Sequence, residues 1–319
     1  MIRYWIRLAF LTIGLSGCFS NIYLIPPAAP LREKEVGGEG PAKIALVDIS
    51  GTISDSQDKD LFGDKPGMLA TLKEKFDRIA ADSAVKAVVL RINSPGGTVT
   101  ASDIIYHEIE RLKARTGKKV VAAIMDVGAS GGYYIAAAAD RIVAHPTAVT
   151  GSIGVIMLTV NLQGLLEKIG VTGTAIKSGP LKDMGSPLRP MTEDERKLFQ
   201  GVIDQLYDRF VSVVVAGRKN LTADQVRTAA DGRIYTGPQA LERGLIDRVG
   251  YLEDAIQLAR ELSGLKQARV VTYQRPGGYR NNIYSAAPDG GGMTVNLVNL
   301  DLSALARAGT PQFMYLWAP

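Results

Sequence analysis

The chain has 319 residues; 46% of them are hydrophobic, 22% are charged, and the net charge is +5. This composition excludes a disordered chain, a collagen-like repeat and a polytopic membrane protein. The basic residues are spread along the chain, so we expect no nucleic-acid partner, which would need a clustered basic face. A single cysteine excludes an intrachain disulfide framework, and two histidines leave a metal site poorly supplied.

The first 17 residues have the pattern of a signal peptide. Arg3 and Arg7 precede an apolar stretch at 8–15 that is too short to cross a bilayer. The sequence LSGC at 15–18 resembles the lipobox of bacterial lipoproteins, which implies that Cys18 is acylated and anchors the protein to a membrane. An uncleaved signal anchor and simple secretion are the alternatives. All three predict that the body of the protein lies outside the cytoplasm, in the periplasm or at the cell surface.

Residues 18–42 contain PPAAP and GGEGP, and this composition predicts a flexible linker. From residue 43 the pattern becomes that of strands alternating with helices, which predicts an α/β fold with a mostly parallel sheet. The expected strands are 44–50, 87–92, 120–125 and 141–145. The expected helices are 66–81, one that begins at Ser102 or Asp103, and a short one at 133–139.

Three of these predicted strands lead into loops rich in glycine and serine. The loops are NSPGG at 93–97, GASGG at 128–132 and TGSIG at 150–154. Because the carboxyl ends of parallel strands meet at one edge of a sheet, we expect the chemistry of the protein to converge there.

The second half of the chain is predominantly helical in pattern. Thr192 with Glu195 forms a capping box, followed by an apolar stripe that includes Leu198, Val202 and Phe210 and ends near Gly217. Further helices are expected from Thr222 to Gly232, from Thr236 to Gly244 and over 253–262. Residues 263–319 form an extension of unknown role, and its apolar end at 311–319 could dock on the body or on a neighbouring copy.

Ser130 is the candidate nucleophile because small neighbours at a strand-to-helix turn leave its hydroxyl accessible and place N–H groups beside it. The general base that would take the proton of the Ser130 hydroxyl is less evident. His107 lies among charged neighbours of a helix and His145 at a strand end, so neither is in a glycine-rich loop. A lysine serves as base when burial lowers its pKa, and Lys182 in a Gly/Pro-containing loop is a candidate. By itself, a lysine in such a loop is typical of a solvated surface.

Four motifs in the same order make the chain similar to a known family. They are INSPGG at 92–97, GASGGYYIA at 128–136, TGSIGVI at 150–156 and SGPLKDMGSP at 178–187. With the further stretch from Gly232 to Asp247, they resemble the signal peptide peptidase A family of serine proteases, peptidase family S49, over residues 43–262. The resemblance is to the short type with one protease domain. Pro180 and Leu181 depart from the residues that the family often carries before its lysine.

The resemblance implies a role for each matching residue. Ser130 is the nucleophile, Lys182 the general base, and Ser152 the hydroxyl that orients the lysine. The oxyanion hole is formed by the backbone N–H of Gly97, with Gly96 as its close competitor, and by that of Gly131. The implied fold is the ββα spiral of the crotonase/Clp-protease type, and no metal or cofactor is needed.

The implied function is that of a membrane-anchored serine endopeptidase with a Ser-Lys dyad. Its substrates are signal-peptide remnants and other membrane-associated peptides, and it forms a homo-oligomer that shields Lys182 from water. Two alternatives remain. One is an inactive scaffold of the same fold that binds peptides. The other is a crotonase-like acyl-CoA enzyme, which needs neither Ser130 nor Lys182 and which the export signal disfavours.

Overall fold

The computed structural model describes residues 30–55, 59–60, 63–64, 67–275 and 312–317, so the predicted signal peptide and Cys18 lie outside the described residues. The strands are β1 (Arg32–Gly38), β2 (Lys43–Ser50), β3 (Lys59–Asp60), β4 (Gly63–Asp64), β5 (Val85–Ser94), β6 (Gly96–Thr98), β7 (Lys119–Ala129), β8 (Arg141–Ala144), β9 (Val149–Gly151), β10 (Ile156–Leu158), β11 (Ile234–Thr236), β12 (Arg248–Val249), β13 (Arg269–Gln274) and β14 (Gln312–Leu316). The helices are α2 (Met68–Ala81), α3 (Val99–Thr116), α4 (Gly131–Ala136), α5 (Gln163–Lys168), α6 (Glu193–Gly217), α7 (Ala223–Ala229), α8 (Gly237–Glu242) and α9 (Leu252–Leu262).

The main sheet has nine strands and is mostly parallel. Its strands follow the order β1-β13-β2-β5-β7-β8-β12, and β9 with β11 continues from the end of β7. All neighbours from β13 to β12 are parallel, whereas β1 and β11 join the sheet antiparallel. The predicted α/β class with a mostly parallel sheet is therefore confirmed.

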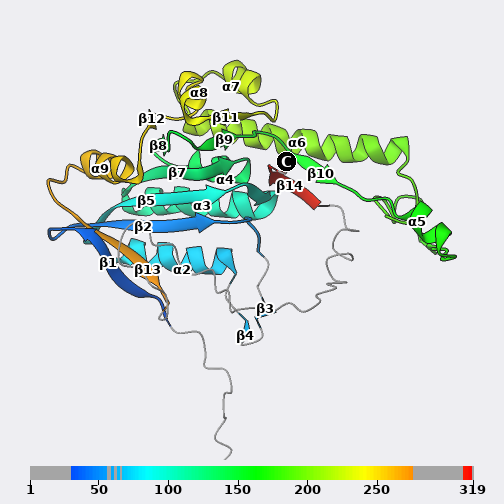
Figure 1. The fold of residues 1–319 in the computed structure, drawn as a ribbon, viewed down its shortest axis with the longest axis horizontal. Coiled ribbons are helices and arrows are strands. Elements are labelled where there is room, and N and C mark those ends of the chain that lie inside the picture. The colour runs from blue at the N-terminus through cyan, green and yellow to red at the C-terminus, as the bar shows by residue number, and fades with distance from the viewer. Residues whose placement is uncertain (1–29, 56–58, 61–62, 65–66, 276–311, 318–319) are drawn as a thin grey trace, which may run out of the picture.

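Helices cover both faces of this sheet (Figure 1). Strand β2 shows why: Ala45, Val47 and Ile49 belong to the core under α2, α3 and α4, whereas Ile44 and Leu46 belong to the core under α9. A strand buried on both faces has no polar side, which is why residues 44–50 form a continuous apolar run.

Two stretches that the sequence analysis placed outside the fold are strands of the main sheet. The prediction of a flexible linker over 18–42 is wrong for residues 32–38, which form β1. Within the extension at 263–319, β13 lies between β1 and β2. The glycines of GGEGP serve the turn between β1 and β2, where Gly38 and Gly40 have φ angles of 72° and 117° that suit glycine. Among the described residues, no helix is long and apolar enough to cross a membrane.

The helix boundaries test the capping predictions. The box of Thr192 and Glu195 is present at the start of α6. Helix α3 begins before the expected Ser102 or Asp103, because the Thr98 side chain accepts a hydrogen bond from the Ala101 N–H at 3.3 Å. Helix α3 thus begins close to the end of β6.

Helix α6 is buried along part of its length only. Phe210 in its second half is fully buried, whereas Leu198 and Val202, which the apolar stripe predicted to be core residues, are 47% and 40% exposed. The first half of α6 extends past the sheet, together with the segment that precedes it (Figure 1).

That preceding segment, residues 159–192, joins β10 to α6 and contains α5; we call it the arm. Figure 1 shows α5 well away from the main sheet. The arm exposes an unusual share of large apolar side chains, namely Val160, Leu165, Ile169, Val171, Ile176, Leu181 and Leu188. The arm therefore leaves much apolar surface open to solvent in a single copy of the chain.

Two glycines of α6 test how tightly its buried end is packed. A β-carbon at Gly217 comes within 2.1 Å of the Ala137 carbonyl oxygen, whereas one at Gly201 meets nothing within 4 Å. We expect Gly217→Ala to lower the free energy of unfolding by about 1–3 kcal/mol through overpacking. Gly201→Ala is the matched control and raises it by about 0.5–1 kcal/mol. Urea unfolding of the two variants measures both; equal effects would contradict the packing of α6 on α4.

Candidate active site

Ser130 lies at the turn between β7 and α4 in a conformation that non-glycine residues rarely adopt. Its φ and ψ are 52° and −117°, and its exposed fraction is 1%. Among the described residues, Ser152 is the one other non-glycine residue with a positive φ, at 50°. Backbone strain of this kind is concentrated at functional sites, where the surroundings hold it in place.

Backbone hydrogen bonds hold both serines in these conformations. The Ser130 N–H donates to the Gly151 carbonyl at 2.7 Å, and the Ser152 N–H donates to the Arg233 carbonyl at 2.8 Å. Pairing of β7 with β9 places Ala129 beside Gly151, so the two serine turns are held next to each other. Ser130 and Ser152 line one hollow of about 380 Å³.

The NSPGG loop approaches the same place from β5 and β6. The Ser94 hydroxyl donates to the Gly51 carbonyl at 2.6 Å and accepts the Gly96 N–H at 3.1 Å. The Gly96 N–H is therefore already engaged. A β-carbon at Gly97 would lie 1.9 Å from the Ile53 carbonyl oxygen, so this position has no room for a side chain.

Strand β14 runs between β6 and β10 in a small antiparallel sheet. Within one copy of the chain, residues 312–317 of the apolar end thus pack on the body. In the register of β14 with β6, Tyr315 is opposite Gly97. The Tyr315 carbonyl oxygen lies 1.9 Å from an ideal β-carbon at Gly96 and 3.1 Å from one at Gly131. A peptide carbonyl thus occupies the space among the three glycines predicted to form the oxyanion hole.

The other side of the hollow has no signature in the sequence. Gln200, Asp204 and Tyr207 of α6 line it, together with Asp231 and Leu316. The α6 residues lie on the side of the helix that its apolar periodicity assigns to solvent, so a periodicity argument had no means of finding them.

The structure does not bring Lys182 into this hollow. Lys182 is exposed on the arm, in a turn where its N–H donates to the Gly179 carbonyl at 3.2 Å, and it is absent from the residues that line the hollow. Within the described part of the chain, its ammonium group has no hydrogen bond or ion pair to a side chain. The predicted dyad is therefore not assembled inside one copy of the chain.

The loop that carries Lys182 is nevertheless fixed. Asp183 pairs with Lys177 at 2.6 Å and with Arg189 at 2.7 Å, and Arg189 also pairs with the buried Glu195 at the start of α6. Hydrogen bonds from Arg189 and Lys177 hold the pKa of Asp183 far below its usual range, and Arg189 lowers the pKa of Glu195. Both carboxylates are thus charged at neutral pH and attach the lysine loop to α6.

The two histidines lie elsewhere. His107 is exposed on α3, and His145 shares a 2.8 Å hydrogen bond with Thr147 and contacts the Tyr251 ring edge-on. Neither lines the hollow beside Ser130. Neither histidine is therefore placed to act as the base for Ser130 within this copy.

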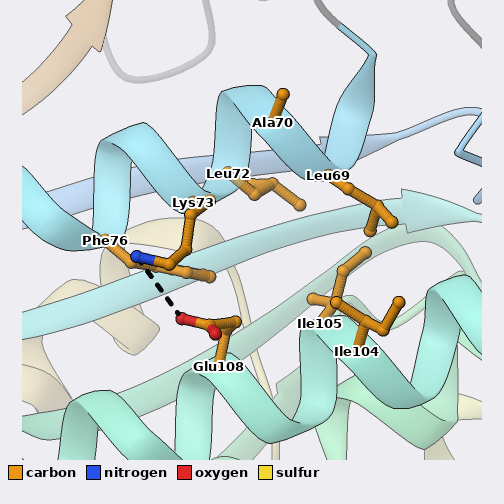
Figure 2. Close-up of a pocket in the computed structure, with 8 residues that line it drawn as sticks. All are labelled: Leu69, Ala70, Leu72, Lys73, Phe76, Ile104, Ile105 and Glu108. Carbon is orange, nitrogen blue, oxygen red and sulfur yellow. Dashed lines mark ion pairs between the residues drawn. The ribbon is translucent and has the colours of Figure 1, made fainter.

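A second hollow, of about 250 Å³, lies between α2 and α3 (Figure 2). Its walls are apolar side chains such as Leu69, Phe76 and Ile105, and an ion pair between Lys73 and Glu108 at 3.9 Å crosses one end. It contains no nucleophile and no strained backbone, so the hollow beside Ser130 is the candidate active site.

Comparisons with known proteins identify the family of the chain. The model of Peptidase family S49 matches residues 113–266, a range that includes Ser130, Ser152 and Lys182. A protein of Enterococcus faecium, provisionally named signal peptide peptidase SppA, is 41% identical over 237 residues, which are 74% of this chain and 68% of that protein. The chain belongs to peptidase family S49.

Two further relatives and a second family model also match parts of the chain. A Synechocystis protein provisionally named a protease is 43% identical over 72% of this chain and 77% of its own length. The chloroplastic serine protease SPPA of Arabidopsis thaliana is 36% identical over 74% of this chain and 35% of its own length. The model of Clp protease matches residues 73–150, which confirms the expected Clp-protease type of fold.

The strain at Ser130 predicts an unusual order of stabilities for this S49 chain. Glycine tolerates a positive φ and alanine does not. We therefore expect the free energy of unfolding of Ser130→Gly to be about 1 kcal/mol higher than that of Ser130→Ala. Ser212 within α6 is the control. Because glycine is unfavourable inside a helix, the free energy of unfolding of Ser212→Gly should be about 1 kcal/mol lower than that of Ser212→Ala. Urea unfolding measures the stability of all four variants. If the alanine variant were the more stable one at both positions, Ser130 would be unstrained.

Proposed function

We propose that the protein is a serine endopeptidase in which Ser130 attacks the peptide bond. The observation that carries the proposal is the Tyr315 carbonyl oxygen, which lies beside Gly131 and opposite Gly97 in the strand register. A substrate carbonyl in that position lies next to the strained Ser130 turn. The backbone N–H groups of Gly97 and Gly131 are then available to stabilise the oxyanion, and the loss of one such donor typically costs a factor of about 10²–10³ in rate.

The assignment of Gly97 rather than Gly96 as donor follows from the loop that holds them. The Gly96 N–H is already engaged by the Ser94 hydroxyl, whereas Gly97 faces β14. A donor that has no partner within its own loop is preorganised for a substrate carbonyl. Gly96 then serves to bring the backbone close to Gly131, because a β-carbon there would lie 2.7 Å from the Gly131 nitrogen.

Lys182 is the proposed general base, supplied by a neighbouring copy of the chain. Its exposure on the arm and its absence from the hollow of its own copy support this arrangement. The exposed apolar side chains of the arm support it as well, because they need a partner surface. Burial between copies disfavours the charged lysine and makes a neutral amine available. Ser152, beside Ser130, is the proposed hydroxyl that orients it.

The proposed reaction has two steps. Neutral Lys182 takes the proton of the Ser130 hydroxyl while the oxygen attacks the carbonyl carbon, and the resulting ammonium then gives that proton to the leaving amine. A water molecule, deprotonated by the same lysine, then cleaves the acyl-enzyme ester and restores the Ser130 hydroxyl.

Signal-peptide remnants and other membrane-associated peptides are the proposed substrates. The name of the Enterococcus faecium relative supports this, and so does the signal-peptide pattern of residues 1–17. The same pattern, with Cys18, supports attachment to a membrane through a lipid or a signal anchor, with the catalytic body outside the cytoplasm.

Mixing two inactive variants tests whether the dyad spans two copies. We expect Ser130→Ala and Lys182→Ala each to reduce hydrolysis of a fluorogenic apolar peptide to near background, while Lys168→Ala, which removes an exposed lysine of α5 on the same arm, stays active. After subunit exchange, an equal mixture of the two inactive variants should regain roughly a quarter of wild-type activity, because some sites receive an intact serine and an intact lysine.

No recovery after verified exchange would mean that serine and lysine act within one chain. Full activity of Lys182→Ala would remove Lys182 as base. Inactivity of the wild type with intact assembly would favour the peptide-binding scaffold.

The arm gives a separate prediction about assembly. Ile176 and Leu165 are 101% and 59% exposed, so Glu at both positions places charge in the proposed contact between copies. We expect this double variant to sediment as a smaller species and to lose activity. Leu241→Glu on α8 is the control: its exposed fraction is 42%, it lies outside the arm, and it should leave both properties unchanged. An active double variant with unchanged sedimentation would contradict the role of the arm.

A further inference from the structure

The NSPGG loop is fastened to the segment that follows β2. At the start of the loop, the Gly51 N–H donates to the Asn93 carbonyl at 3.0 Å. Further along, the Ile53 N–H donates to the Gly96 carbonyl at 2.8 Å. The Ile53 carbonyl in turn accepts the Thr98 N–H at 2.9 Å, where the loop passes into α3. Backbone hydrogen bonds thus hold the loop at both of its ends.

The Ser94 side chain adds two hydrogen bonds within this loop. Its hydroxyl gives its one proton to the Gly51 carbonyl at 2.6 Å, which is the nearer acceptor because the Gly96 carbonyl is 3.5 Å away. The hydroxyl oxygen accepts the Gly96 N–H at 3.1 Å. The exposed fraction of Ser94 is 0%, so both bonds are shielded from water, which strengthens them.

Gly96 is the position where such a restraint has the largest effect. Its φ angle is 101°, in a region that glycine enters freely, and the next residue is also a glycine. Two consecutive glycines give the backbone many conformations, and the bond from Ser94 selects one of them. In that conformation the Gly96 N–H points at Ser94, while Gly97 pairs with β14 beside the candidate active site.

We propose that Ser94 is the positioning residue of the oxyanion hole: its hydroxyl turns the Gly96 N–H away from the substrate, so that Gly97 supplies the donor. The proposal rests on the proposed function, since the group to be stabilised is a substrate carbonyl beside Ser130. Ser94 is not among the residues that line the hollow, so it acts through the backbone of the loop. A displaced donor costs transition-state stabilisation more than substrate binding, because the negative charge on the oxygen develops during the reaction.

Steady-state kinetics separate these two effects. Ser94→Ala removes the hydroxyl without adding bulk. We expect its kcat for a fluorogenic apolar peptide to be roughly 10–100-fold below that of the wild type, because a donor displaced by about 1 Å loses much of its effect. We expect its KM to change less than about twofold.

Thr116→Val is the matched control for the lost hydroxyl. The Thr116 hydroxyl also donates to a carbonyl, that of Leu112 at 2.7 Å, and also accepts a backbone N–H, that of Lys118 at 3.3 Å. It lies at the far end of α3 from the NSPGG loop. Thr116→Val should therefore leave kcat and KM within about twofold of the wild type.

Hydrogen–deuterium exchange of the substrate-free protein measures the restraint itself. We expect the amides of residues 93–98 to exchange roughly fivefold faster in Ser94→Ala than in the wild type, for one lost hydrogen bond. Thr116→Val should leave the exchange of this stretch unchanged. Ser94→Cys covers the case in which Ser94→Ala does not fold. Its thiol is a weak donor and acceptor of similar shape, so its kcat should fall roughly threefold to tenfold with KM unchanged.

Each outcome decides between the two claims. If kcat were unchanged in the Ser94 variants, or if the loss fell on KM alone, the positioning role would be overturned. Unchanged exchange over residues 93–98 in Ser94→Ala would overturn it as well. A wild type that hydrolyses no peptide, together with faster exchange in Ser94→Ala, would keep the restraint on the loop and overturn the proposed function.

Discussion

The candidate active site depends on a change of partner along one edge of β7. On that edge, residues 121–124 of β7 pair in parallel with β8 and residues 127–129 pair in parallel with β9, while the other edge pairs with β5 as far as Gly128. This change of partner places the Ser130 turn beside the Ser152 turn, and the bond from the Ser130 N–H to the Gly151 carbonyl fixes a backbone conformation that serine avoids on its own. The β5–β6 loop and α4 are positioned from the same strand ends. The glycines proposed for the oxyanion hole therefore have their geometry before any substrate arrives.

A second constraint is the apolar surface of the arm, which one copy of the chain leaves exposed to solvent. The arm carries Lys182 and much of the exposed large apolar surface, yet its loop is braced by the charges of Asp183, Arg189 and Glu195. A braced loop with an apolar surface is suited to packing against another copy without first being ordered, which lowers the entropic cost of assembly. The proposed supply of Lys182 by a neighbouring copy makes a specific demand: activity must depend on assembly.

The sequence predicted the parts of the fold that depend on local pattern. The parallel strands, the capping box at Thr192 and the three loops at the strand ends follow from residues that are near one another in the chain. Strands β1 and β13 were missed because their pairing joins residues 32–38 to 269–274, and no local pattern records such a partner. The same limit applies to the site. Ser130 could be found from its loop, whereas the contacts of Tyr315 with Tyr134 and Phe210 join β14 to α4 and α6, and no local pattern records them.

The claim that Ser130 is the nucleophile is tested most directly by covalent labelling. The wild-type protein is treated with a fluorophosphonate probe, and the modified residue is located by peptide mass spectrometry. The account predicts one adduct, on the Ser130 hydroxyl, whose formation slows strongly in Lys182→Ala and not in His145→Ala. An adduct on another residue, or labelling of Ser130 that is independent of Lys182, would contradict it.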